Sequence, residues 1–175
     1  MNAKNLTWMK GVRYCPSPNF DERTANIELL VIHSISLPAG KFGGPFIDQL
    51  FTNSLDNRPD FAEIINLRVS AHLLIRRDGE IVQYVALDKR AWHAGISSFN
   101  GRTKCNDFSI GIELEGCDDV PYTGIQYQKL AKVTKILQQT WPSLTNIAGH
   151  CDIAPKRKTD PGPLFDWERF KNSIR

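Results

Sequence analysis

Short apolar runs separated by polar turns are the clearest pattern along this chain, and they predict buried β-strands. Four of the runs, at residues 28–33, 69–76, 80–85 and 109–116, are rich in Val, Ile and Leu. Runs of this length and composition are typical of strands. The turn at residues 77–79 has the sequence Arg-Asp-Gly, and its glycine tolerates the positive φ angle of a tight hairpin. We therefore expect the second and third runs to pair as an antiparallel hairpin.

Apolar residues recur at helical spacing in a second set of segments. The longest spans residues 123–140, where Thr123 and Gln126 form the pattern of a capping box. A last helix is expected after Asp166, which can cap it, and a further short strand at residues 145–148. Strands and helices alternate, with one antiparallel hairpin. The predicted fold class is therefore α/β: a single domain with a mixed central β-sheet flanked by helices.

The size and composition of the chain fit one domain spanning residues 1–175. Its 175 residues are 41% hydrophobic and 23% charged, which is ordinary for a globular protein. Residues 1–27 mix prolines with polar residues and are expected to form an irregular lead-in. Residues 34–66 are a long excursion between two strands, with a short helix expected at residues 45–53. Such an excursion can form a wall or lid over a substrate, or it can be a packed surface loop.

Composition and charge exclude several classes of function. No run approaches the roughly 18 apolar residues of a membrane span, and residues 1–8 lack the apolar core of a secretory signal. We therefore expect a cytoplasmic location, no membrane partner and a monomer. The net charge of +3 is small and the basic residues are scattered, which argues against nucleic acid as a partner. The four cysteines form no CxxC pair, so reduced thiols are expected rather than a structural zinc knuckle.

Candidate chemistry is densest in the polar, proline-containing loop at residues 149–163. This loop contains His150 and Asp160, and His33 ends the first predicted strand, where ligands gather in open α/β sheets. Two histidines and a carboxylate can hold a zinc ion and leave one position open for water. The spacing alone also allows a structural role for these residues, because a single histidine is more often a structural residue than a metal ligand.

Two carboxylates, Glu113 and Glu115, lie on the same face of the strand predicted at residues 109–116. A carboxylate there can act as general base, taking a proton from the attacking water and passing it to the leaving amine. Glu113 is the first choice, Glu115 competes for the role, and either can instead form a structural ion pair. Lys158 can place its ammonium beside a developing oxyanion, or it can belong to a solvated basic run at residues 156–158.

The remaining two histidines, His72 and His93, are further candidates. Either could replace one of the proposed metal ligands. His72 lies inside a predicted strand, where a core role is the simpler expectation. Trp92 and His93 could form an aromatic wall for a sugar or a peptide, although Trp92 can equally belong to the core.

Several joined segments of the chain, from about residue 12 to residue 170, resemble one known family. The segments that carry the resemblance are Leu30-Val31-Ile32-His33, Phe42-Gly43-Gly44-Pro45, Leu67-Arg68-Val69-Ser70-Ala71-His72, Asp88-Lys89-Arg90-Ala91-Trp92-His93-Ala94-Gly95, Asn106-Asp107-Phe108-Ser109-Ile110-Gly111-Ile112-Glu113 and Lys158-Thr159-Asp160-Pro161-Gly162-Pro163. On these motifs the sequence is identified as a member of the zinc-dependent N-acetylmuramoyl-L-alanine amidase superfamily. It is similar to the cytoplasmic branch that acts on 1,6-anhydro-muropeptides, and the superfamily also includes peptidoglycan-recognition and phage-type relatives.

The resemblance implies a metal site, a catalytic pair and a substrate. It implies Zn²⁺ held by His33, His150 and Asp160, with Glu113 as proton acceptor and Lys158 as transition-state stabiliser. The implied substrate is a small muropeptide, cleaved in cell-wall recycling between the lactyl group of anhydro-N-acetylmuramic acid and L-alanine. The family contacts the stem peptide with basic residues, which implies substrate-binding roles for two side chains here. These are Arg68 and Lys104. Arginine is usual in the family at the position of Lys104, and a lysine does not replace an arginine in a bidentate contact with a carboxylate.

Two other functions are compatible with the resemblance. A non-catalytic muropeptide-binding module would keep the groove and lose metal ligands, whereas all three ligand positions are filled here. An amidase acting on intact peptidoglycan would share the same site, and the expected absence of a secretion signal argues against it.

Overall fold

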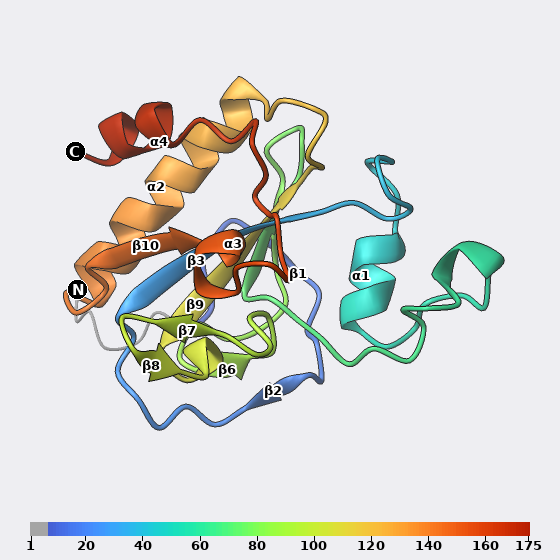
Figure 1. Ribbon diagram of the computed structural model, residues 1–175, viewed down its shortest axis with the longest axis horizontal. Helices are drawn as coiled ribbons and strands as arrows, with labels where there is room; N and C mark the ends of the chain where they lie inside the picture. Colours follow the sequence, from blue (N-terminus) through green and yellow to red (C-terminus); the bar gives the residue numbers. More distant parts are fainter. Residues whose placement is uncertain (1–6) are drawn as a thin grey trace.

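A six-stranded sheet forms the centre of the molecule in this computed structural model, which describes residues 7–175 (Figure 1). The strands, in their order across the sheet, are β1 (Arg13–Tyr14), β5 (Ile81–Gln83), β4 (Leu73–Ile75), β9 (Ser109–Glu115), β3 (Leu29–Ile35) and β10 (Asn146–Gly149). All neighbours are parallel except β4 and β5, which form the predicted antiparallel hairpin. The sheet is therefore mixed, and β4 and β9 lie at its middle.

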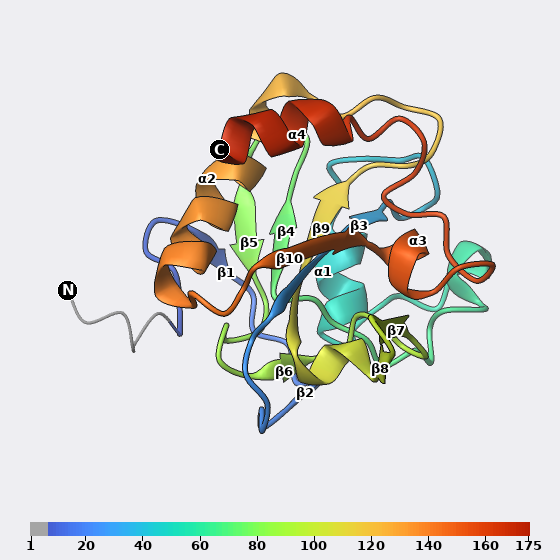
Figure 2. The ribbon, with the colours of Figure 1, turned by 60° about the vertical axis from the view of Figure 1, so that its left-hand side comes forward.

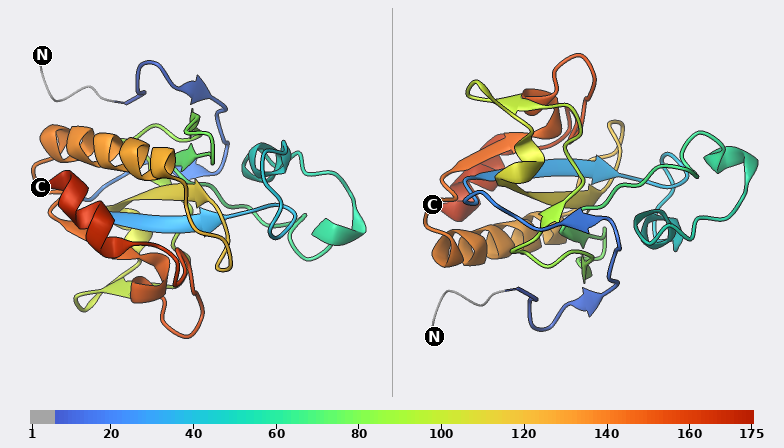
Figure 3. Two further views of the ribbon diagram at one scale, coloured as in Figure 1. Left: turned by 90° about the horizontal axis from the view of Figure 1, so that it is seen from above. Right: turned by 90° about the horizontal axis from the view of Figure 1, so that it is seen from below.

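Two helices cover one face of this sheet (Figure 3). They are α2 (Gly124–Thr140) and α4 (Trp167–Ile174). Both begin as the sequence predicts, because Thr123 and Gln126 form the capping box of α2 and the Asp166 side chain accepts the Arg169 amide of α4. Their apolar faces pack on Ile110, Ile112 and the other strand residues that point to this side. This packing forms the main hydrophobic core.

Shorter elements lie on the opposite face of the sheet (Figure 2). They are β2 (Phe20–Asp21), β6 (Arg90–Ala91), β7 (Ser98–Phe99), β8 (Arg102–Thr103), η3 (Cys105–Asp107) and α3 (His150–Ile153). The predicted α/β fold, with a mixed sheet and flanking helices, is confirmed. No helix within residues 7–175 combines the length and apolar character that a membrane crossing needs.

The excursion at residues 34–66 projects beyond the carboxyl ends of β3 and β9 (Figures 1 and 3). It contains α1 (Phe46–Phe51), close to the predicted position, and the short η2 (Pro59–Phe61). Buried side chains including Ile47, Phe51 and Phe61 anchor it to a second apolar cluster that contains Leu74 and Val82 of the sheet. The segment is thus a packed wall in this structure, and its action as a lid stays a prediction.

Two features differ from the sequence-based expectation. The lead-in at residues 1–27 is irregular only in part, because β1 adds a parallel edge strand to the sheet and β2 pairs with β6; residues 1–6 lie outside the described residues. Strands of two residues carry no periodicity from which they could be predicted. The loop at residues 149–163 also opens with the one-turn helix α3, because its prolines begin only at Pro155.

Candidate active site and metal centre

The structure brings His33, His150 and Asp160 together although they are far apart in the sequence. Strand β10 runs parallel to β3 with Gly149 opposite Ile32, so the residue that follows β10 lies beside His33. The His33 Nδ1 atom is 3.0 Å from His150 Nδ1 and 3.2 Å from Asp160 Oδ2, and His150 Nδ1 is 3.0 Å from the same oxygen. The amide of Cys151 donates to the Asp160 carbonyl at 2.9 Å and fixes the loop that carries the carboxylate.

The hydrogen bonds of His150 define which of its ring nitrogens carries the proton. Its Nε2 atom lies 3.2 Å from the carbonyl oxygen of Ala94. A carbonyl oxygen only accepts, so the neutral ring holds its proton on Nε2. The Nδ1 atom that faces His33 therefore presents a bare lone pair.

A chain of hydrogen bonds defines His33 in the same way. Ser109 Oγ donates to the Cys105 carbonyl at 2.6 Å, and it therefore accepts from His93 Nε2 at 3.2 Å. His93 Nδ1 is then unprotonated and accepts from His33 Nε2 at 2.9 Å. The proton of His33 is on Nε2, and its Nδ1 atom is bare. Burial lowers the pKa of His33 to about 4, which keeps the ring neutral at neutral pH.

With both rings in these neutral forms, the three converging atoms are two imidazole nitrogens with free lone pairs and one carboxylate oxygen. Such a set of converging acceptors is suited to hold a cation. Imidazole nitrogen and carboxylate oxygen are both zinc ligands, and three protein ligands leave a position open for water. The residues present therefore fit the metal that the family resemblance implies.

Glu113 lies next to this cluster, because β9 pairs with β3 in the register that sets Glu113 opposite His33. Its carboxylate is buried, and Oε2 has no hydrogen-bond partner within residues 7–175. Burial raises the pKa of Glu113 well above its ordinary value, the charge of Asp160 adds to this, and the ammonium of Lys158 opposes it. An unpartnered carboxylate with a raised pKa beside a metal-ligand cluster is suited to accept a proton.

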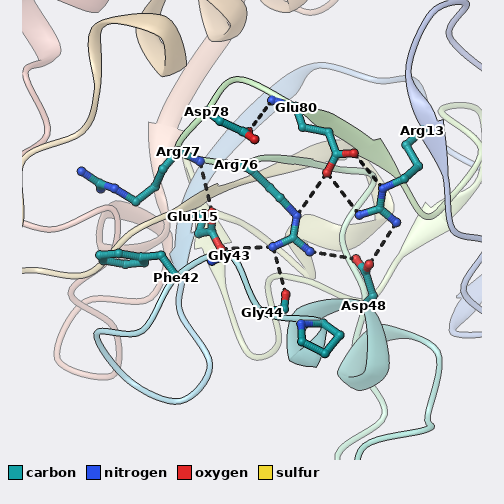
Figure 4. Close-up of a pocket in the computed structure, with 11 residues that line it drawn as sticks. Arg13, Phe42, Gly43, Gly44, Asp48, Arg76, Arg77, Asp78, Glu80 and Glu115 are labelled. Atoms are coloured by element: carbon teal, nitrogen blue, oxygen red, sulfur yellow. Dashed lines mark hydrogen bonds and ion pairs between the residues drawn. The ribbon is translucent and has the colours of Figure 1, made fainter.

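Glu115, the competing candidate, is occupied by structural contacts (Figure 4). Its Oε1 atom accepts the Gly43 amide at 2.6 Å and Arg76 Nη1 at 3.1 Å, and its Oε2 atom accepts the Arg77 amide at 3.1 Å. The side chain lines a different cavity, beside Arg76 and the start of α1. The structure thus favours Glu113 over Glu115 as the residue available for proton transfer.

A cavity of about 220 Å³ opens onto the metal-ligand cluster. Its polar side carries Glu113 and Lys158, and its apolar side comes from the 34–66 excursion and the loop that follows it. Residues on the apolar side are Ile35, Leu50, Phe51, Leu67 and Val69. The cavity therefore combines the proposed catalytic groups with a wall against which a substrate can pack.

Two of the four predicted substrate-binding residues line this cavity and two do not. Trp92 and His93 lie in its wall. Arg68 is exposed outside it, where its guanidinium donates to the Ile65 and Leu67 carbonyls. Lys104 is also exposed, on a left-handed backbone turn before η3. Their contacts with substrate stay predictions.

His72 occupies the core position that its strand pattern suggests. Its ring is fully buried, Nδ1 accepts the Gly111 amide at 3.0 Å, and Nε2 is 3.0 Å from the Lys89 carbonyl. Both ring nitrogens are used by backbone groups, so His72 is not free to bind a metal.

Sequence reasoning missed two residues of β9 that contact the histidines. Ser109 supports His93, as described above, and a Cβ atom at Gly111 would lie 2.5 Å from His93 Cγ. A glycine inside a strand often marks a close approach by another group. That signal was present in the sequence at Gly111, whereas nothing in the pattern distinguishes Ser109.

Comparison with known proteins agrees with this site. The family model described as N-acetylmuramoyl-L-alanine amidase matches residues 23–163. The chain therefore belongs to the N-acetylmuramoyl-L-alanine amidase family and is an amidase, which confirms the resemblance found in the sequence.

Two AmpD proteins and one AmpD crystal structure are similar to nearly the whole chain. The chain is 62% identical to the 1,6-anhydro-N-acetylmuramyl-L-alanine amidase AmpD of Escherichia coli K12, over 94% of this chain and 92% of that protein. It is 53% identical to AmpD of Haemophilus influenzae, over 93% of this chain and 92% of that protein. A crystal structure of a selenomethionine AmpD derivative superposes with a TM-score of 0.95 at 60% identity and covers 98% of both chains.

A more distant relative has been solved with a ligand. E. coli AmiD, in complex with anhydro-N-acetylmuramic acid-L-Ala-D-gamma-Glu-L-Lys, has a TM-score of 0.61 at 33% identity, over 84% of this chain and 57% of that one. The shared fold thus includes proteins whose ligands contain anhydro-N-acetylmuramic acid joined to a peptide.

Proposed function

We propose that this protein hydrolyses the amide bond between the lactyl group of 1,6-anhydro-N-acetylmuramic acid and the L-alanine of the stem peptide. The observation that carries the proposal is the convergence of three potential metal ligands beside the buried, unpartnered Oε2 atom of Glu113. The names of the AmpD relatives and the ligand of AmiD support the choice of substrate. Such a substrate is a soluble cell-wall fragment, so the enzyme is assigned to cytoplasmic recycling.

We propose that His33, His150 and Asp160 hold Zn²⁺. When bound in such a site, zinc lowers the pKa of water and polarises a carbonyl. Glu113 Oε2 then takes a proton from the attacking water as the new C–O bond forms. The same carboxyl returns that proton to the alanine nitrogen as the amide C–N bond breaks. The two products are the free lactyl carboxylic acid and the peptide with a new amino terminus.

Lys158 and the cavity wall complete the proposed mechanism. The Lys158 ammonium lines the cavity beside Glu113, where a positive charge stabilises the oxyanion that develops on the scissile carbonyl. The apolar wall and Trp92 are assigned to the sugar and the first part of the peptide. Arg68 and Lys104, which lie outside the cavity, are assigned to more distant carboxylates of the stem peptide.

The test compares turnover of a soluble anhydro-muropeptide by the native enzyme, the chelated enzyme and His150→Ala. Both treatments are expected to abolish peptide release, and zinc is expected to restore it only in the chelated native enzyme. Undiminished turnover after chelation would exclude the zinc mechanism. A protein that binds the muropeptide and releases no peptide would instead be a binding module.

The choice of soluble substrate over intact wall needs a separate comparison. Turnover of soluble anhydro-muropeptide is expected to exceed turnover of purified sacculi at equal amide concentration. Faster release from sacculi would assign the enzyme to intact peptidoglycan.

A further inference from the structure

The four histidines of the chain form one continuous row that ends at the proposed metal centre. Neighbouring ring centroids are 5.7 Å apart between His72 and His93, 5.0 Å between His93 and His33, and 4.5 Å between His33 and His150. His93 is thus the ring directly behind the ligand His33. Within residues 7–175, the His93 ring forms hydrogen bonds with His33 and Ser109 and none with His150 or Asp160, so its role differs from that of a metal ligand.

We propose that His93 is a positioning residue that holds His33 with its proton on Nε2 and its Nδ1 atom toward the metal. The hydrogen bonds from His33 to His93, from His93 to Ser109 and from Ser109 to the Cys105 carbonyl all run in one direction. Each donor in the chain meets one acceptor, and the chain terminates on a carbonyl that cannot donate. If His93 or Ser109 alone reversed its proton, two donors would face each other, and if His33 alone did so, two acceptors would face each other.

The face of β9 that carries Glu113 is shaped to hold this ring. Ser109, Gly111 and Glu113 alternate along the strand and point to one side. Ser109 supplies the acceptor for His93 Nε2, and Gly111 supplies the space, because a Cβ atom there would lie 2.5 to 2.8 Å from three ring atoms. One strand face thus positions the ligand through His93 and also presents the proposed base.

The backbone of His93 is fixed as firmly as its ring. Asn106 Oδ1 accepts the amides of His93 at 3.1 Å and of Ala94 at 2.8 Å. The Ala94 carbonyl is in turn the acceptor for His150 Nε2 at 3.2 Å. The segment at residues 93–94 therefore sets the orientation of both histidine ligands, one through a side chain and one through a backbone carbonyl.

This arrangement predicts a measurable effect on metal affinity. Partners of metal-ligating histidines commonly change affinity about 10- to 100-fold when they are removed. Without an acceptor at Nε2, the neutral His33 ring can hold its proton on Nδ1, and that proton must be displaced before a metal binds. A loss of this kind raises the zinc Kd, and saturating zinc restores most of kcat.

The experiment measures zinc Kd for the metal-free protein by competition with a chelating dye, and follows the His33 tautomer by ¹⁵N NMR of the imidazoles. The variants are His93→Phe and Ser109→Ala. The control is Ser143→Ala, which removes a hydroxyl that donates to the Ile27 carbonyl far from the site. We expect Kd to rise about 10- to 100-fold in His93→Phe and several-fold in Ser109→Ala, with a mixed His33 tautomer in both and no change in the control.

The inference rests on the proposed metal site, and the outcomes distinguish the two. A native protein that binds no zinc overturns the proposed function and this inference with it. Native binding together with Kd values within twofold in both variants, and an unchanged His33 tautomer, overturns the role of His93 alone. If His93→Phe does not fold, the Ser109→Ala affinity and the native tautomer decide the question by the same criteria.

Discussion

Glutamine substitutions at Glu113 and Glu115 should distinguish a catalytic role for Glu113 from a structural role for Glu115, although both side chains lie on one face of β9. The two side chains are two residues apart in β9 and both are buried, with 8% and 2% exposure. Glu113 has an unpartnered oxygen at the metal-ligand cluster, whereas Glu115 accepts three hydrogen bonds from Gly43, Arg76 and Arg77 (Figure 4). The same chemical change is therefore expected to have opposite consequences.

The expected magnitudes follow from these contacts. Losing a general base slows turnover by about 100- to 10,000-fold. Glu113 Oε2 makes no hydrogen bond within residues 7–175, so the stability of Glu113→Gln is expected to match or exceed the native value. Breaking a buried ion pair costs about 3–5 kcal/mol. Because Arg76 keeps its ion pairs with Asp48 and Glu80, we expect Glu115→Gln to lose about 3 kcal/mol. For a chain of this size that lowers Tm by roughly 6–12 °C.

The assay pairs thermal unfolding with initial rates on a soluble anhydro-muropeptide, both at neutral pH and with zinc present. Glu113→Gln should unfold like the native protein and release almost no peptide. Glu115→Gln should unfold at a lower temperature and keep a kcat near the native value at a temperature where it is folded. The reasoning is refuted if Glu113→Gln keeps its kcat, or if a stably folded Glu115→Gln loses activity to the same extent.

Three further predictions concern stability. Burial lowers the pKa of His72 to about 3. Below about pH 6.5, His72 therefore binds a proton in the unfolded chain and does not bind it in the folded chain. Urea unfolding should therefore show stability falling, as the pH drops from about 6.5 toward 3, by up to about 1.4 kcal/mol per pH unit for this group; a flat profile over that range would contradict it. Thr123→Ala removes the cap of α2 and should cost about 1 kcal/mol with turnover unchanged; an unaltered urea midpoint would mean that the cap does not stabilise the helix. Zinc at roughly 1,000 times its Kd should stabilise the native protein by about 4 kcal/mol, or roughly 8–16 °C in Tm, and should leave Asp160→Ala unshifted; equal shifts in both would place the metal elsewhere.

The parts of the fold that local patterns specify were predictable from the sequence. The apolar runs gave the long strands, Thr123 and Gln126 gave the start of α2, and the Arg-Asp-Gly turn gave the hairpin of β4 and β5. These signals depend on neighbours a few residues apart. Strands β1 and β2 escaped prediction because their two residues pair with distant partners and have no period of their own.

The site was predictable only in its residue types. The sequence supplied His33, His150 and Asp160 as candidates, but their convergence depends on the parallel pairing of β10 with β3. The choice between Glu113 and Glu115 could not be made from alternation, because both point to the same side of β9. It follows only from the Gly43 amide and the Arg76 guanidinium, which fold back onto Glu115 from distant segments.

The hydrogen-bond partners of His93 also could not be predicted from the sequence. An aromatic-wall role was predicted from its neighbour Trp92, and the side chain does line the cavity. The structure adds that both its ring nitrogens are engaged by His33 and Ser109, which lie 60 and 16 residues away in the sequence. No local pattern could indicate these contacts, although Gly111 marked the place where β9 admits another group.

The most direct test of the metal-dependent mechanism is a zinc titration of the metal-free enzyme with peptide release from a soluble anhydro-muropeptide as the readout. Activity should rise from a baseline near zero in proportion to added zinc and level off at about one ion per chain, and His33→Ala should stay at the baseline throughout. Full activity in the metal-free enzyme, or an identical titration curve in His33→Ala, would contradict the account.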